Sequence, residues 1–147
     1  MKINKKNINV SNLDINNLKK INLNIYIRKN SFFDFSKVIV KKPWGFEFLL
    51  YQNKKLAIWF LYLKKNHKTS FHCHMHKKTL LYVAKGSISF RSLKFSKKYK
   101  EGEFVEIGKK VFHQSKSISQ KGSVVLELES PVNKNDLVRL SDDYGRT

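Results

Sequence analysis

The stretch Ser70-Phe71-His72-Cys73-His74-Met75-His76-Lys77 decides how the rest of this sequence is interpreted. Side chains alternate between the two faces of a β-strand, so His72, His74 and His76 are predicted to share one face. Three imidazoles on one face are costly to bury as ordinary core, whereas neutral imidazole nitrogens are common ligands of divalent metals. The alternative is a polar strand whose histidines face solvent.

A fourth histidine follows in a later predicted strand. The turn Glu101-Gly102-Glu103 leads into the strand 104–107, and Val111-Phe112-His113 then begins a new strand. A histidine cluster drawn from two strands predicts a site for one divalent metal ion, with zinc, manganese, iron and nickel as candidates. A vacant or purely structural pocket remains the alternative, and His67 in the turn 64–68 is expected to be exposed.

The pattern around the histidines predicts an all-β domain. Aromatic and β-branched residues occur in short runs separated by Gly, Asn, Ser and Lys rather than in stripes of helical period. Turns are expected at residues 52–54, 85–86, 101–103 and 121–122, and Pro131 is expected to end the last strand, because proline cannot donate to a ladder. The predicted strands are Glu47–Gln52, Leu56–Leu63, Thr69–His74, Thr79–Lys85, Ser87–Phe90, Phe104–Ile107, Val111–Ser117 and Val124–Glu129.

Residues 1–37 differ in composition from the rest of the chain and are predicted to form an N-terminal arm. Asn, Lys and Ile dominate there, without Gly or Pro. Alternation over Leu23–Ile27 predicts an edge strand or a strand exchanged in a dimer, and the first twenty residues are expected to be disordered. One core is enough for a chain of 147 residues, so we assign residues 38–147 to a single domain.

The formal net charge of +19 is the strongest compositional signal and by itself suggests a nucleic-acid partner. However, only Arg28, Arg91, Arg139 and Arg146 are arginines, and the lysines are spread along the chain among asparagines and isoleucines. Nucleic-acid surfaces usually cluster their charge and use arginine for bidentate contacts. We therefore rank nucleic-acid binding low and attribute the charge mostly to composition.

No apolar stretch of about 18 residues is present, so no membrane span is expected, and the Lys/Asn-rich N-terminus lacks the apolar region of a secretory signal. The single cysteine, Cys73, cannot form an internal disulfide, which fits a reducing compartment. These features predict a cytoplasmic protein.

The spacing of the histidines and glycines resembles the two sequence motifs of the cupin superfamily. The His72-x-His74 pair precedes Gly86, and Gly102 precedes His113, at the distances that those motifs have. The resemblance implies a double-stranded β-helix, which is a jelly-roll-like barrel, carrying the N-terminal arm. The proline and glycine of the second motif are replaced by Gly108 and Lys110.

Within the cupins the sequence is most similar to the isomerase domain of the bifunctional mannose-1-phosphate guanylyltransferase and mannose-6-phosphate isomerase family. The three similar blocks are Lys42-Pro43-Trp44-Gly45, the histidine-rich segment 70–77 and the tail 135–146. The resemblance covers residues 42–146 and leaves the arm outside.

This resemblance implies roles for individual residues. The metal ligands of the family fall on His72, His74 and His113, with His76 as a possible substitute, while the usual glutamate ligand falls on Thr79, whose hydroxyl is a poor replacement. Glu127 matches a glutamate of that family. Glu127 and Glu129 share a strand face and are candidate catalytic bases, although an exposed polar face is equally compatible with the pattern. Candidate phosphate anchors are Lys42, Lys77, Arg139 and Arg146.

These features lead to three hypotheses about function. The first is a metal-dependent isomerase or epimerase for a phosphorylated or nucleotide-linked sugar in surface-polysaccharide precursor metabolism. The second is a non-catalytic sugar-binding or regulatory cupin, favoured by Thr79 at the glutamate position. The third, a basic nucleic-acid-binding protein, depends on charge alone. Small barrels of this type often pair through an edge strand, so we expect a homodimer with a small sugar or sugar phosphate as ligand.

Overall fold

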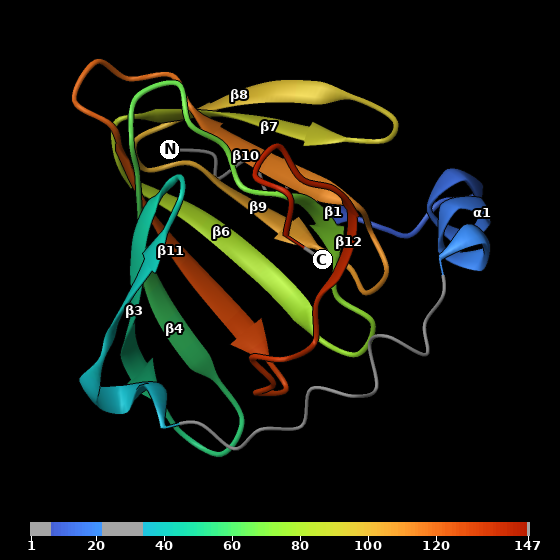
Figure 1. The fold of residues 1–147 in the computed structure, drawn as a ribbon, viewed down its shortest axis with the longest axis horizontal. Helices are drawn as coiled ribbons and strands as arrows, with labels where there is room; N and C mark the ends of the chain where they lie inside the picture. Colours follow the sequence, from blue (N-terminus) through green and yellow to red (C-terminus); the bar gives the residue numbers. More distant parts are fainter. Residues whose placement is uncertain (1–6, 22–33, 147) are drawn as a thin grey trace.

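The computed structural model describes residues 7–21 and 34–146 and arranges them as two β-sheets that face each other (Figure 1). The larger sheet has seven strands in the order β1-β9-β6-β11-β4-β3-β2, and the smaller has five in the order β12-β5-β10-β7-β8. Every strand pairing is antiparallel except that of β1 with β9. The predicted all-β fold class is confirmed.

The strands of the larger sheet are β1 (Asn7–Ile8), β2 (Ile39–Lys42), β3 (Gly45–Gln52), β4 (Ala57–Leu63), β6 (Lys78–Lys85), β9 (Phe104–Ile107) and β11 (Ser123–Ser130). Those of the smaller sheet are β5 (Phe71–Cys73), β7 (Ser87–Ser92), β8 (Ser96–Lys100), β10 (His113–Ser117) and β12 (Val138–Ser141). The helix α1 (Asn12–Lys20) and a 3-10 turn at Phe35–Lys37 complete the described elements.

Most predicted strands are present with shifted ends, but four of the described strands were not predicted, namely β1, β2, β8 and β12. Strand β11 ends at Ser130, directly before Pro131, as expected, yet β12 follows it. Strand β2 precedes the first predicted strand and borders the larger sheet. Strand β8 was not predicted because its sequence, Ser-Lys-Lys-Tyr-Lys, shows no alternation of apolar and polar residues. Only Tyr99 is buried in this strand.

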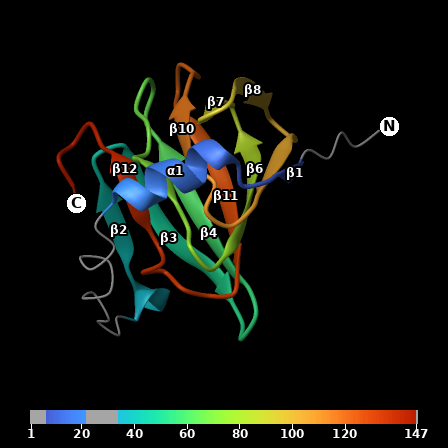
Figure 2. The ribbon, with the colours of Figure 1, turned by 90° about the vertical axis from the view of Figure 1, so that its right-hand side faces the viewer.

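The N-terminal arm is partly ordered, and the expectation of disorder is wrong for residues 7–20. Ser11 and Asp14 form a capping box at the start of α1, in which the Ser11 amide donates to Asp14 Oδ2 at 2.9 Å. The other carboxylate oxygen of Asp14 accepts the Phe112 amide at 2.7 Å, so the helix is fixed to the segment that precedes β10. Figure 2 shows α1 lying across the barrel strands.

Leu18 is the apolar anchor of this helix. It is buried against the outer face of the smaller sheet, beside Phe71, Cys73, Phe112 and Val138. The predicted edge strand Leu23–Ile27 lies outside the described residues. In residues 7–21 and 34–146 no helix is both long enough and apolar enough to cross a membrane.

The main core lies between the two sheets and follows the strand period. Along β4 the buried residues alternate as Ala57, Trp59, Leu61 and Leu63, whereas the residues between them are only partly buried. Each fully buried aliphatic side chain stabilises the fold by about 1.5–3 kcal/mol relative to an exposed one. The same alternation carries polar side chains into one part of the barrel, where β5, β6, β10 and β11 meet.

Candidate metal centre

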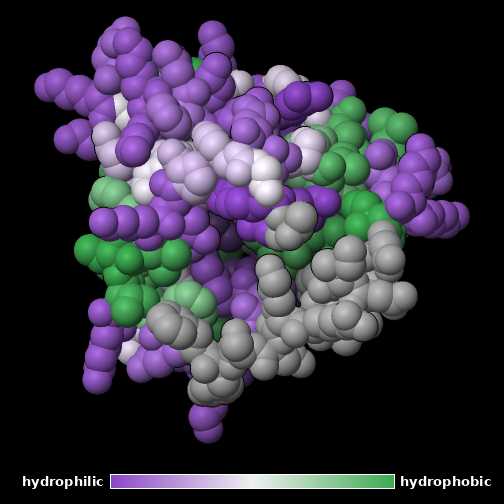
Figure 3. Space-filling model, in the orientation of Figure 1, coloured by the Kyte–Doolittle hydropathy of each residue, from purple (hydrophilic) through white to green (hydrophobic). Residues whose placement is uncertain are grey.

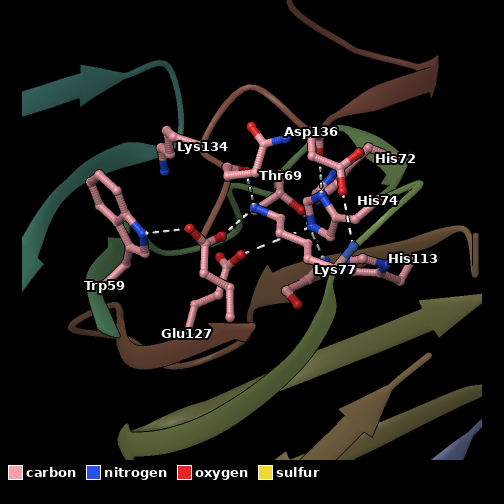
Figure 4. A network of polar contacts seen from close by, with 12 residues as sticks. Trp59, Thr69, His72, His74, Lys77, His113, Glu127, Lys134 and Asp136 are labelled. Carbon is pink, nitrogen blue, oxygen red and sulfur yellow. Dashed lines mark hydrogen bonds and ion pairs between the residues drawn. The ribbon is translucent and has the colours of Figure 1, made fainter. Parts of the chain in front are cut away.

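Three of the predicted ligands meet inside the barrel. His72 on β5 lies directly opposite His113 on β10 in the antiparallel register, and His74 follows the end of β5. One nitrogen from each ring lies within 4.8 Å of the others. All three side chains are buried, and Figure 4 shows them next to one another. The chain thus brings three nitrogen donors to one point, as a bound divalent ion requires.

The orientation of each ring is set by a backbone carbonyl. His72 Nδ1 bonds Ser70 O at 2.9 Å, His74 Nδ1 bonds Asp136 O at 2.5 Å, and His113 Nδ1 bonds Val111 O at 2.9 Å. A carbonyl oxygen can only accept, so in these bonds each Nδ1 carries the proton and each Nε2 keeps its lone pair. Nε2 of His74 is buried and makes no hydrogen bond with any described residue. These are the features of metal-ligating imidazoles.

Burial also keeps the rings neutral. It lowers the pKa of His113 to about 4, and it holds the pKa of His72 and of His74 well below 6.5. The neighbouring His113 adds to the effect on His72, and Lys77 adds to the effect on His74. Near pH 7 the three rings therefore need not lose a proton before they bind a cation.

The buried Asp136 carboxylate holds the turn that follows the second histidine. It accepts the amides of Met75, His76 and Lys77 at 2.8, 2.7 and 3.0 Å. Strand β5 ends at Cys73 because this carboxylate, rather than a neighbouring strand, receives the amides. The prediction that His76 shares the strand face of His72 is therefore wrong, and the His76 side chain is exposed outside the cluster.

Glu127 and Glu129 both point into the barrel from β11, but their surroundings differ. Glu129 is 1% exposed, forms an ion pair with the Lys77 ammonium and accepts Trp59 Nε1 at 3.2 Å. Glu127 Oε1 lies 3.9 Å from His74 Nε2 and lines the cavity described below. Burial raises the pKa of the Glu127 carboxyl, while Lys77 and Lys134 oppose that shift. Only Glu127 combines proximity to the histidines with access to a ligand.

A cavity of about 700 Å³ opens beside the histidines. Its lining includes all four predicted phosphate anchors. Lys42 lies 3.3 Å from Glu47, and Arg146 forms a two-bond contact with Asp142 at 2.6 and 3.0 Å. Lys77, by contrast, is 2% exposed and bonds Glu129 and the Asn133 carbonyl.

Sequence reasoning missed several of the residues around this cavity. Lys134 lies 2.7 Å from Glu47 Oε1, and its ammonium is 3.6 Å from the centre of the Trp59 ring. Because the sequence is rich in lysine, nothing in it distinguished Lys134 from an ordinary solvent-exposed lysine. Asp136 falls within the similar tail 135–146, but its role could not be predicted, because it depends on amides about 60 residues away.

Thr79 occupies the position where the resembling family has a carboxylate ligand. Its side chain faces the interior at 2% exposure, and Oγ1 forms no hydrogen bond with the described residues. In the sheet Thr79 is paired with Glu129 on one side and Ile107 on the other, and it does not line the cavity. The carboxylate that approaches the histidines is that of Glu127, from a different strand.

No family model matches the sequence, and no curated protein matches it either. Solved structures do match its fold. KdgF from Halomonas sp. superposes with a TM-score of 0.62 at 14% identity, over 71% of this chain and 94% of that protein. An RmlC-like cupin from Shewanella frigidimarina gives 0.59 at 16% identity, over 73% and 95%.

A sugar phosphate isomerase of the cupin superfamily from Silicibacter pomeroyi gives a TM-score of 0.55 at 13% identity. The superposition covers 59% of this chain and 59% of the isomerase. Identities this low establish fold and leave substrate open. The structure has two facing β-sheets with three buried histidines between them. Together with these structural neighbours, this shows that the chain has the cupin fold.

Proposed function

We propose that this protein is a metal-dependent isomerase or epimerase that acts on a phosphorylated or nucleotide-linked sugar. One observation carries the proposal: three neutral histidines converge beside the Glu127 carboxylate, and two of them, His72 and His74, line a cavity with a basic rim. The sugar phosphate isomerase among the structural neighbours is consistent with this substrate class. We place the reaction in surface-polysaccharide precursor metabolism.

His72, His74 and His113 would hold the metal. When bound, a divalent ion supplies Lewis-acid stabilisation of the negative charge that develops on a sugar oxygen. Zinc, manganese, iron and nickel all suit a set of imidazole ligands.

Glu127 is the proposed base that moves a proton between neighbouring sugar carbons. A raised pKa brings a carboxyl closer to the value at which it can both accept and return a proton near neutral pH. Glu129 is engaged by Lys77 and Trp59, so we assign it to positioning rather than proton transfer. Lys77 would serve that same positioning role.

The phosphate of the substrate would bind at the cavity rim. Arg139, Arg146, Lys42 and Lys134 all line it, and guanidinium groups bind phosphate in a forked geometry. Arg146 is held in place by Asp142. A rim of this kind selects anionic sugars over neutral ones.

The test joins metal analysis to an isomerase assay over a panel of sugar phosphates. We expect the wild type to copurify with a divalent metal, His113→Ala to lose both metal and turnover, and Glu127→Gln to keep the metal while turnover falls by about 10²–10⁴-fold. Turnover that survives in His113→Ala would refute the metal-dependent mechanism. Equal turnover in Glu127→Gln would remove Glu127 from the proton path.

A non-catalytic sugar-binding or regulatory cupin is the second candidate, favoured by Thr79 in place of a carboxylate ligand. It predicts saturable sugar-phosphate binding without turnover for any member of the panel. Nucleic-acid binding ranks below both candidates because only net charge supports it. The cytoplasmic location and the homodimer stay predictions, which cell fractionation and light scattering of the purified protein would check.

A further inference from the structure

A second cavity, of about 480 Å³, lies on the outer face of the smaller sheet. Strand β10 separates it from the histidines, since His113 and Ser115 face the barrel interior while Gln114 and Lys116 point outward to line this cavity. Hydrophilic side chains cover the upper part of the molecule, over β7 and β8, in Figure 3. The proposed sugar site uses none of the residues that line this cavity.

Two lysines lie side by side on one face of the sheet and both line this cavity. Lys68 and Lys116 are partners in an antiparallel bridge, flanked by the bonds Thr69 N to Ser115 O and Ser117 N to His67 O. The lysines therefore occupy a non-hydrogen-bonded pair, the position in which opposite side chains approach most closely. Like charges placed in this way destabilise a sheet unless an anion lies between them or nearby.

The acidic groups nearby neutralise only part of this charge. Asp143 pairs with Lys68 at 2.8 Å, whereas Lys116 and Arg91 have no acidic partner within residues 7–21 and 34–146. Arg91 projects from β7 opposite Gln114, and its guanidinium lies 5.2 Å from the centre of the Phe71 ring. Three cations and one carboxylate thus surround the cavity, leaving an excess of positive charge.

The floor of the cavity leaves room for a ligand. Ser89 lies opposite Lys116 on β7, Ser96 lies opposite Arg91 on β8, and both help to line the cavity. Short hydroxyl side chains between long cations leave a hollow lined with hydrogen-bond donors. The cavity volume is within the range of sites for small molecules.

We propose that this cavity is a binding site for a small phosphate-bearing ligand, separate from the sugar site in the barrel. Arg91 supplies a forked donor, and the neighbouring residues Lys68 and Lys116 supply two ammonium groups. The cavity volume of about 480 Å³ favours a compact anion over a nucleic-acid strand, which needs an extended groove. The site depends on neither the metal nor the catalytic proposal.

The test is a titration of the full chain with inorganic phosphate, followed by two-dimensional proton–nitrogen NMR at about 0.15 M KCl so that diffuse attraction is screened. We expect saturable shifts of the amides of residues 68, 91 and 116. The variant Lys116→Gln should weaken this binding about tenfold, which is typical for the loss of one charge-assisted contact.

Two control variants separate this site from other sources of binding. Lys54→Gln removes the same charge from an exposed turn and should change the affinity less than twofold. Arg139→Gln perturbs the barrel rim and should leave the shifts at residues 68, 91 and 116 intact. Shifts that do not saturate, that weaken equally in Lys116→Gln and Lys54→Gln, or that vanish in Arg139→Gln would overturn the proposal. So would tighter binding of a single-stranded oligonucleotide at the same amides.

Discussion

The interior of the barrel has a packed half and a hollow half, and strand β11 contributes side chains to both. In the packed half Leu63, Val83, Ile88, Phe90 and Tyr99 are at most 2% exposed. The hollow half contains the three histidines, the Lys77–Glu129 pair and Glu127. Along β11 the inward side chains change from Val125 to Glu127 in one strand step. The difference shows that one half stabilises the barrel by burying apolar side chains. In the other half, buried charged and polar groups depend on ion pairs and hydrogen bonds with one another.

The largest expected effect comes from breaking the buried Lys77–Glu129 ion pair in the hollow half. Lys77→Met leaves the Glu129 carboxylate buried without its cation, so the free energy of unfolding should fall by about 3–5 kcal/mol in urea titrations. The double variant Lys77→Met/Glu129→Gln should recover most of this loss. A single variant as stable as the wild type would show that the ion pair is not needed in the fold.

Acid should also destabilise the hollow half of the metal-free protein. The pKa of His113 is about 4 in the folded chain and 6.5 in an ordinary setting, so between these values only the unfolded state takes up the proton. The stabilisation is complete above pH 6.5 and is lost as the pH falls to 4, by about 3 kcal/mol. His113→Phe, measured over the same pH range, should show a shallower loss. Parallel curves for the two proteins would contradict the prediction.

A smaller effect is expected where the turn after His74 is fixed. Asp136→Asn replaces one acceptor oxygen with an amino group that faces backbone amides, so His74 should shift and metal affinity should fall about 10–100-fold. Calorimetric titration with Zn²⁺ measures the change. Asp143→Asn, in the same C-terminal tail, removes a carboxylate that bonds none of the histidines and serves as the matched control. Equal affinities in the two variants would show that Asp136 does not position His74.

The smallest effect belongs to the packed half. Ile88→Val removes one methylene from a fully buried side chain and should lower the free energy of unfolding by about 1 kcal/mol. Metal affinity should not change, because Ile88 does not line the histidine cavity. A loss of metal binding in Ile88→Val would mean that the two halves are coupled rather than independent.

The parts of the fold that could be predicted are those encoded locally. Alternation along β4 and β6, the turn glycines and the His72-x-His74 spacing all point to a β-barrel with clustered histidines. The Ser11-x-x-Asp14 capping box of α1 was also present in the sequence, but the surrounding asparagines and lysines favoured disorder.

What could not be predicted depends on distant partners. Glu127 and Glu129 look alike in the sequence, and only the structure separates them, because the partner Lys77 comes from a turn 52 residues away from Glu129. Asp136 is similar, since its three amide partners lie in the turn after β5. Contacts of this kind leave no periodic pattern, so residue spacing does not reveal them.

The carbonyl acceptors of the three histidines have an evolutionary consequence. Ser70, Val111 and Asp136 orient the rings through main-chain oxygens, which every amino acid provides. At Val111 a substitution that preserves the backbone path therefore leaves the ring orientation unchanged, whereas the Ser70 hydroxyl also contacts His72 Nδ1 at 3.2 Å. The amino acid at such a position can change during evolution while the backbone keeps the imidazole ring in the same orientation. A lineage with this backbone can regain a lost ligand by a single substitution, because the orienting framework persists without it.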